Sequence, residues 1–236
     1  LSDKEIQFQL WRIANRIVEP TAINELKQNK KEHLELAFQY IETIKGQLLS
    51  PQIVFEAMDL DRKFNYFIAM FEEFEIWRRQ NARISYSDML YDPVRAIEQA
   101  PALKSLVTNK MDLVLVDEYQ DTNDIQHALL KHIAGTRAMI TIVGDPDQTI
   151  YEFRGAKPEY MLRGFVKDYP EAQSFKLSYS FRYGHQISLL ANHLIANNAD
   201  RQAMLCISSP LESNNGCHFA QGAFGNQCCR RLIKRV

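Results

Sequence analysis

Four apolar residues that run directly into two neighbouring carboxylates constrain the fold of this chain more than any other feature. The run covers residues 113–116 (Leu-Val-Leu-Val), and Asp117 and Glu118 follow it. A continuous run of Val and Leu is typical of a strand buried on both faces of a parallel sheet. Ligands of open α/β sheets bind at the carboxyl ends of the strands. We therefore expect Asp117 and Glu118 to lie at a ligand site, where two acids suit a bound Mg²⁺ and an activated water.

The second half of the chain alternates between strand patterns and helix patterns. Strands are expected at residues 113–116, 139–143 and 174–177. Helices are expected between and after them, at about 124–134, 157–169 and 184–197. This alternation predicts an α/β fold in which parallel strands are joined by crossover helices.

The first 82 residues predict helices alone. Ser2 and Glu5 form a capping-box pattern at the start, and Pro20 is expected to close the first helix. Further helices are expected at about 31–45, with Gly46 just past the end, and from Ser50-Pro51. A longer helix at 62–81 carries an aromatic stripe. That stripe could form a binding face, but its spacing is what a single buried face requires, so we expect core packing.

One more helix is expected before the first strand. Ser85 and Asp88 repeat the capping-box pattern, and Pro93 is expected to bend or divide the region that follows. No linker rich in Gly and Ser separates the helical part from the α/β part.

Composition limits the choice of partner. Hydrophobic residues make up 46% of the chain and charged residues 24%, which is ordinary for a globular protein with a core. The formal net charge is −1, so a nucleic-acid partner would need a local basic surface. No apolar run approaches the roughly 20 residues of a membrane span, and no secretory signal opens the chain. The basic run at 230–235 is expected to be solvated surface rather than a functional patch.

The four cysteines are confined to the last 31 residues. Their spacing matches no zinc pattern, so we expect reduced thiols, with metal binding as the alternative. They are Cys206, Cys217, Cys228 and Cys229.

Three polar loops follow the three predicted strands. The first carries Asp117, Glu118 and Gln120; the other two begin near residues 145 and 181. If the strands are parallel and adjacent, all three loops lie at one edge of the sheet. The second loop carries Gln148, which can sense a phosphate, and the third carries Arg182, which can neutralise charge. Together with the acids for a metal, these are the parts that phosphoryl transfer uses.

Aromatic residues follow the second loop directly. Tyr151, Phe153 and Arg154 come just after Gln148. Exposed aromatic rings with an arginine suit single-stranded nucleic acid, because bases stack on them. The alternative is that Tyr151 and Phe153 pack beneath the sheet.

Three segments resemble the motifs of one family, the UvrD/Rep-like superfamily I DNA helicases. Residues 117–123 (Asp-Glu-Tyr-Gln-Asp-Thr-Asn) resemble motif II, and residues 144–156 resemble motif III almost throughout. Residues 177–182 resemble motif IV, and the order and separation also fit. The resemblance covers roughly residues 84–200 well. It implies a partial RecA-like parallel sheet of the P-loop NTPase type, preceded by an all-helical inserted subdomain.

The resemblance implies a role for five residues in ATP hydrolysis. Asp117 would hold the Mg²⁺ of MgATP, and Glu118 would act as general base on the attacking water. Gln148 would contact the γ-phosphate and couple its presence to the DNA site. Phe181 would stack on the adenine, and Arg182 would be the arginine finger.

The resemblance also implies a DNA site and a division of the chain. Tyr151 and Phe153 would stack on bases of the translocated single strand, with Arg154 at the junction between the two sites. Single-stranded DNA and duplex junctions would be the partners, in a bacterial-type cytoplasm. Residues 1–82 would belong to the inserted subdomain 1B, 83–177 to the first motor domain 1A, and 178–236 to the start of the second, 2A.

Two departures qualify the resemblance. Motif IV of the family usually reads Asn-Tyr-Arg-Ser, whereas this chain has Ser180-Phe181-Arg182-Tyr183. A P-loop reads Gly-x-x-x-x-Gly-Lys-Ser/Thr, and no Gly-Lys pair occurs in the sequence. The first residue is Leu rather than Met. We therefore expect an internal fragment of a helicase, inactive alone, that lacks the P-loop and the late motifs. The alternative is a relative without a P-loop that only binds DNA or a protein partner.

Overall fold

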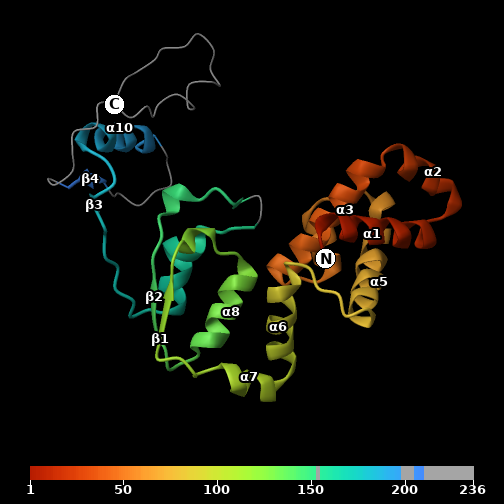
Figure 1. Cartoon of the computed structure of the whole chain (residues 1–236), viewed down its shortest axis with the longest axis horizontal. Coiled ribbons are helices and arrows are strands. Elements are labelled where there is room, and N and C mark those ends of the chain that lie inside the picture. The colour runs from red at the N-terminus through yellow and green to blue at the C-terminus, as the bar shows by residue number, and fades with distance from the viewer. Residues whose placement is uncertain (153–154, 198–204, 210–236) are drawn as a thin grey trace, which may run out of the picture. The chain divides into compact units, whose positions relative to one another are not determined.

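The computed structural model describes residues 1–152, 155–197 and 205–209. The chain divides into two compact units, one of which is Leu1–Met161 and the other of which begins at Leu162. The three divisions expected from the sequence (1–82, 83–177 and 178–236) remain a prediction. In chain order, the helices and strands are α1 (Asp3–Ile17), α2 (Pro20–Gln28), α3 (Lys30–Gln47), α4 (Pro51–Ala57), α5 (Tyr66–Gln80), α6 (Asp88–Gln99), α7 (Pro101–Val107), β1 (Leu113–Val116), α8 (Asp124–Ala134), β2 (Met139–Ile142), α9 (Phe165–Asp168), β3 (Tyr179–Ser180), α10 (His185–Ile195) and β4 (Ile207–Ser208) (Figure 1).

The helical part of the first unit begins as the sequence predicts. Ser2 and Glu5 form the expected capping box of α1, and Ser50 caps α4. Helix α2 was not expected; it starts at Pro20, which the sequence suggested only as the end of the first helix. The expected end of α3 before Gly46 is wrong. Helix α3 continues to Gln47 and ends at Leu48, which adopts the left-handed conformation usually left to glycine (φ 56°).

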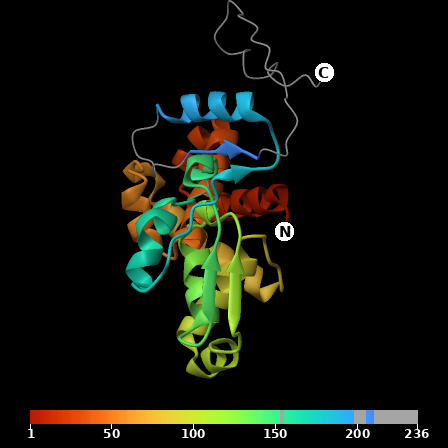
Figure 2. The same cartoon turned by 90° about the vertical axis from the view of Figure 1, so that its left-hand side faces the viewer.

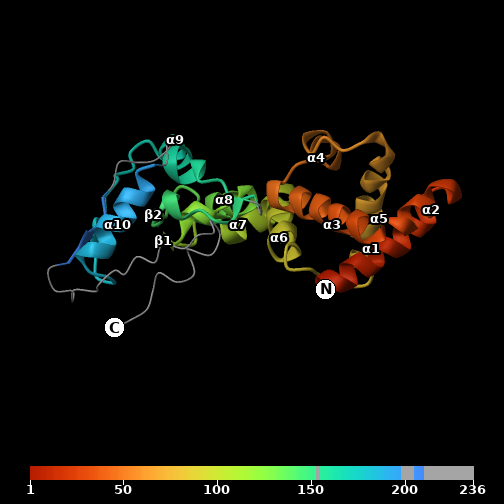
Figure 3. The same ribbon diagram turned by 90° about the horizontal axis from the view of Figure 1, so that it is seen from above.

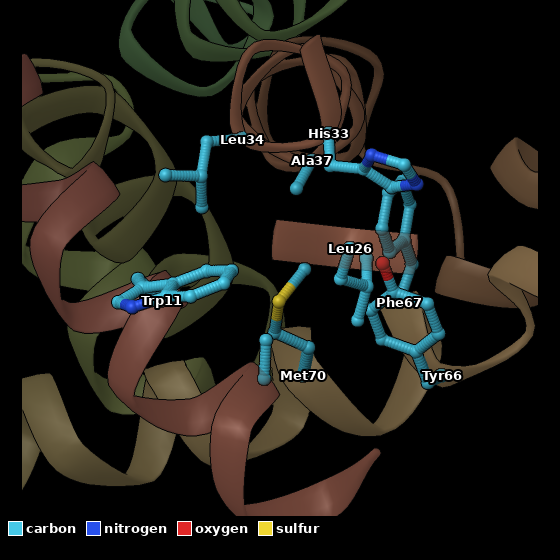
Figure 4. Close-up of a pocket in the computed structure, with 9 residues that line it drawn as sticks. Trp11, Leu26, His33, Leu34, Ala37, Tyr66, Phe67 and Met70 are labelled. Atoms are coloured by element: carbon cyan, nitrogen blue, oxygen red, sulfur yellow. The ribbon is translucent and has the colours of Figure 1, made fainter. Parts of the chain in front are cut away.

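The core of the helical part lies between α1, α3, α4 and α5, which Figure 3 shows as one group. The aromatic stripe of α5 belongs to this core, as expected: Phe67 and Phe74 are fully buried. A cavity of about 10 Å³ remains beside Trp11, Leu34 and Met70 (Figure 4). It has room for about one water molecule, so it is a packing defect rather than a ligand site.

A buried ion cluster fastens α6 to α3 and α5. It consists of Lys45, Glu75, Arg78, Asp88 and Asp92. The Lys45 ammonium bonds Asp88 and lies 3.1 Å from Glu75, and the Arg78 guanidinium bonds Asp92 at 2.6 and 2.8 Å. Lys45, Arg78 and Asp88 are each 1% exposed, so their charges are removed from water and must balance one another.

The pKa of Asp88 lies below its ordinary range. Burial acts to raise that pKa, but the charge and hydrogen bond of Lys45 lower it by more, and Ser85 adds two hydrogen bonds to the carboxylate. The reciprocal bonds between Ser85 and Asp88 are the predicted capping-box pattern, although α6 itself begins only at Asp88. Helix α6 is continuous through Pro93 and is not divided there.

The α/β part of the first unit is built on one parallel strand pair. Strands β1 and β2 lie side by side in the same direction (Figure 2), with Leu113 opposite Met139 and Val116 opposite Ile142. Helix α8 begins with a capping box formed by Asn123 and Gln126. It packs against α3 and α6. The expectation that β1 is buried on both faces is wrong. Leu115 is 70% exposed, because exposed and half-buried residues alternate along β1 and only one face of the pair is covered.

The second unit differs more from expectation. Strand β3 comes later than the strand expected at 174–177 and pairs in parallel with β4, which was not expected. A π-helical turn at Tyr160–Gly164 and the short α9 stand where one helix was predicted at 157–169. Helix α10 matches the prediction. Among the described residues β3 and β4 form a separate sheet from β1 and β2, so the condition under which all three polar loops would share one sheet edge is not met. Within the described segments no helix is both long enough and apolar enough to cross a membrane.

The ion cluster predicts a large stability effect from one side chain. We expect Lys45→Met to lower the free energy of unfolding by about 3–5 kcal/mol, because it leaves Asp88 and Glu75 buried beside an excess of negative charge. The matched control is Lys31→Met in the same helix, whose exposed ammonium lies 3.8 Å from Glu35. That control is expected to change stability by less than about 0.5 kcal/mol. Urea unfolding followed by circular dichroism measures both, and equal effects would contradict the prediction.

The same variant changes how stability depends on pH. The folded-state pKa of Asp88 is lowered, so its contribution is present above the unfolded pKa and is lost as the pH falls through the folded pKa. Because Lys45 is the main cause of the lowering, the free energy of unfolding of Lys45→Met, measured by urea unfolding, should fall less than that of the native chain as the pH drops below about 4, the ordinary aspartate pKa.

Candidate functional site

Two loops meet at the carboxyl ends of β1 and β2. The carboxylate loop, residues 117–123, follows β1, and the glutamine loop, residues 144–149, follows β2. Hydrogen bonding continues past the strands: the Val143 N–H donates to the Val116 carbonyl (2.8 Å), and the Tyr119 N–H donates to the Val143 carbonyl (2.9 Å). The prediction that the first two polar loops share one sheet edge is therefore confirmed.

Asp117 and Glu118 are exposed at this edge. The Asp117 carboxylate accepts a hydrogen bond from the Glu118 N–H (2.9 Å). Glu118 itself has a left-handed backbone, φ 52° and ψ 41°, which is uncommon for a residue with a side chain. Such backbones cost on the order of 1–3 kcal/mol and occur preferentially at functional sites.

Gln120 joins the two loops beneath the carboxylates. Its side chain is 2% exposed. The amide nitrogen donates to a carboxylate oxygen of Glu118 (2.7 Å), and the amide oxygen accepts from the Asp145 N–H (3.0 Å). The sequence placed Gln120 in a polar loop but gave it no role, because both of its contacts depend on how the two loops are paired.

The glutamine loop is ordered by Asp145. One oxygen of its carboxylate accepts from the Asp147 N–H (3.0 Å) and caps the short 3₁₀ turn Pro146–Gln148. The other oxygen accepts from the Gln148 amide (2.7 Å). Gln148 is exposed, and its side chain is bonded to Asp145 within the loop that follows β2.

The segment after the glutamine loop is fastened to the start of α8. The Lys157 ammonium bonds both oxygens of Asp124 (2.7 and 2.9 Å), and the Tyr160 hydroxyl bonds the same carboxylate. The Lys157 N–H also donates to the Thr122 carbonyl (3.0 Å). Tyr151, 39% exposed, lies between these anchors and Gln148. Phe153 and Arg154 lie outside the described residues.

An aromatic group supports the carboxylate loop from below. Tyr119 is buried, and its hydroxyl bonds the Nδ1 atom of His127 (2.8 Å). The His127 ring stacks on Tyr160 with centroids 4.1 Å apart. The sequence did not single out Tyr119, His127 or Tyr160; the i, i+8 separation of the first two carries no periodic signal.

The third loop lies in the second unit. Phe181 is 64% exposed, Arg182 is also exposed, and the Arg182 N–H donates to the Ser180 hydroxyl (3.3 Å). The loop follows β3, not a strand of the β1–β2 pair, so the expected alignment of all three loops on one sheet is not found. Tyr183 bonds the thiol of Cys206 (3.2 Å), which raises the Tyr183 pKa, as does burial.

Cys206 is a free thiol, as expected. The remaining cysteines, residues 216–221, for which the sequence suggests a strand, and the basic run 230–235 lie outside the described residues.

The donor set at the open edge fits one metal ion only in part. Among the described residues no group of three or more His, Cys, Asp or Glu side chains could enclose a metal. Mg²⁺ does not need such a cage, because it is usually bound by one or two carboxylates together with phosphate oxygens and waters. The exposed Asp117 carboxylate at a strand end is compatible with that role.

Comparison with known proteins identifies relatives. A family model described as the UvrD/REP helicase N-terminal domain matches residues 3–170. The ATP-dependent DNA helicase Rep of Salmonella typhimurium is 39% identical over 161 residues, which are 65% of this chain and 24% of that protein. The ATP-dependent DNA helicase PcrA of Staphylococcus aureus is 30% identical over 187 residues, which are 79% of this chain and 25% of that protein. The chain thus spans about a quarter of the length of these curated relatives.

Because the two loops lie close together, adding one methyl group at Gly144 is expected to lower stability. A Cβ atom at Gly144 would lie 2.4 Å from the Gln120 amide oxygen and 3.0 Å from the Tyr119 nitrogen. We expect Gly144→Ala to lower the free energy of unfolding by about 1–3 kcal/mol, because Gln120 and the backbone must both move.

Gly46→Ala is the matched control for this prediction. Gly46 lies within helix α3, and a Cβ atom there would be 3.7 Å from the Asn123 side chain, an ordinary van der Waals distance. This change is expected to raise stability by about 0.5–1 kcal/mol, because alanine favours a helix over glycine. Thermal unfolding measures both variants, and a neutral Gly144→Ala would contradict the close approach.

Proposed function

The chain belongs to the UvrD/Rep helicase family, and we propose that it is a part of an ATP-dependent DNA helicase that couples ATP hydrolysis to movement along single-stranded DNA and duplex unwinding. One observation carries this proposal. The carboxylate loop and the glutamine loop leave adjacent parallel strands at one edge and are joined there by buried hydrogen bonds. That arrangement supports the proposal, because two acids and a glutamine amide in the loops after neighbouring strands are groups that phosphoryl transfer uses.

The proposed roles on the nucleotide side follow from position and chemistry. We propose that Asp117 holds the Mg²⁺ of MgATP, whose charge helps to neutralise the phosphates, and that Glu118 takes a proton from the attacking water. Gln148 is exposed at the same edge and would contact the γ-phosphate. Phe181 would stack on the adenine and Arg182 would neutralise developing charge; both side chains are exposed, which supports a role toward a ligand.

The proposed roles on the DNA side rest on the segment after Gln148. Tyr151 would stack on a base of the single strand, together with Phe153 and Arg154. The anchors at Lys157 and Thr122 support this proposal, because they tie the segment to the carboxylate loop. Single-stranded DNA and duplex junctions are the proposed partners, in the cytoplasm of a bacterium. A P-loop and late motifs would come from the remainder of the motor.

The general base can be tested in the full-length protein. We expect Glu118→Gln to reduce kcat for DNA-stimulated ATP hydrolysis by about 10²–10⁴-fold and to leave nucleotide affinity largely intact, because the amide cannot accept the proton of the attacking water. Phosphate release and binding of a fluorescent ATP analogue give the two quantities. Glu35→Gln in α3, also an exposed acid, is the control and should not change kcat.

The 236-residue chain gives a second arm of this experiment. It has no Gly-Lys pair for a phosphate cradle, so we expect little or no turnover from it. Robust hydrolysis by the 236-residue chain, or unchanged turnover in the full-length Glu118→Gln variant, would count against the proposed chemistry.

The stacking role predicts a loss of DNA affinity. We expect Tyr151→Ala in the full-length protein to weaken binding of a labelled oligo-dT by about 1–3 kcal/mol, the usual value of one base–aromatic stack. Tyr86→Ala is the control, since Tyr86 is 87% exposed but lies before α6. Fluorescence anisotropy at fixed salt compares the two, and equal affinities would remove Tyr151 from the DNA site.

A further inference from the structure

Gln120 is a buried amide whose two ends are both bound, each to a different loop. The amide nitrogen bonds Glu118 at 2.7 Å and the amide oxygen bonds the Asp145 N–H at 3.0 Å. Exchanging the two ends would set the amide oxygen against a carboxylate and the amide nitrogen against an N–H group. Only one orientation therefore satisfies both partners.

The bond to Glu118 fixes an otherwise mobile carboxylate. Glu118 is exposed, and a solvated glutamate samples several rotamers. The Gln120 amide takes one carboxylate oxygen, Oε2, and leaves Oε1 for a water. A buried donor that fixes the orientation of the Glu118 carboxylate keeps it in place relative to the attacking water. Catalysis is sensitive to small errors in such placement.

The bond to Asp145 extends the connection into the glutamine loop. Asp145 accepts from Gln148 on one carboxylate oxygen and from the Asp147 N–H on the other. A continuous series of hydrogen bonds thus runs from Glu118 through Gln120 and Asp145 to Gln148. Gly144 leaves space for it, because a Cβ atom there would overlap the Gln120 oxygen.

We propose that Gln120 is a positioning residue that holds the Glu118 carboxylate and ties it to the loop that carries Gln148. This inference rests on the proposed function, since it assigns Gln120 to the same hydrolysis reaction. If Gln148 shifts, Asp145 shifts with it. Gln120 then passes the shift on to the Glu118 carboxylate and changes its orientation. Gln120 itself touches neither water nor phosphate in this role.

The experiment separates the two ends of the amide. In Gln120→Ala both bonds are lost, whereas in Gln120→Glu the carboxylate still accepts from the Asp145 N–H but donates to Glu118 only when protonated. In the full-length protein we expect Gln120→Ala to lower kcat at least about tenfold with KM for ATP within about twofold. For Gln120→Glu we expect kcat relative to the native enzyme to fall as the pH rises, because the donor is lost.

Gln126→Ala is the matched control. Gln126 also bonds a backbone N–H, that of Asn123 (3.0 Å), but only as part of the α8 capping box. Its loss should reduce stability without altering kcat or the pH profile. A purely structural role for Gln120 would give the same pattern as this control.

Amide exchange in the 236-residue chain supplies a readout besides activity. The Asp145 amide should exchange about tenfold faster or more in Gln120→Ala and should stay protected in Gln120→Glu. Unchanged exchange in Gln120→Ala overturns the bridge. If the native full-length protein hydrolyses ATP and Glu118→Gln does not, an unchanged kcat in Gln120→Ala overturns the positioning role alone. Absence of hydrolysis by the native protein overturns the proposed function and this inference together.

Discussion

The parallel register of β1 and β2 is the constraint on which the candidate site depends. Leu113 opposite Met139 sets the pairing, and it brings Val116 and Ile142 to the same level. The two loops that follow are separated in sequence by residues 124–143, yet they leave the sheet side by side. Because side chains alternate along a strand, a shift of one residue would turn Asp117 away from its present side. The backbone bonds of Val143 and Tyr119 carry the pairing past the strands and so remove that freedom.

The helical part contributes to the site through α8. The ion cluster holds α6 to α3 and α5, and both α3 and α6 pack on α8, which begins just after the carboxylate loop. A buried cluster of this kind is weak evidence for net stability, since apolar residues of the same volume could serve as well. Its geometric effect is more definite. Three carboxylates and two cationic groups that must match one another allow α6 a single place against the neighbouring helices.

The features that the sequence predicts well are local ones. The capping boxes, the aromatic core of α5 and the strands β1 and β2 follow from spacing within a few residues, and the shared edge of the two loops follows from the parallel pairing that the alternation of strands and helices predicts. Contacts formed by tertiary pairing were missed: Gln120 meets Asp145 across 25 positions, and β3 finds its partner near residue 207. For the same reason the sequence left open whether the third strand is adjacent to the first two, a condition that the described residues do not meet, and Leu115 was expected to be buried although its face is open.

Glu118 shows where local preference gives way to the needs of the site. A left-handed turn between β1 and Tyr119 lets the Tyr119 N–H return to Val143 and buries the Tyr119 ring beside His127. Glycine would form that turn without strain, and asparagine would form it at lower cost. Neither offers a carboxylate at the open edge. The same left-handed backbone occurs at Leu48, Asp59, Ala82 and Asn109, but of these residues only Glu118 follows a strand of the β1–β2 pair and has its side chain bonded by the buried Gln120 amide, which is what the proposed role of its carboxylate requires.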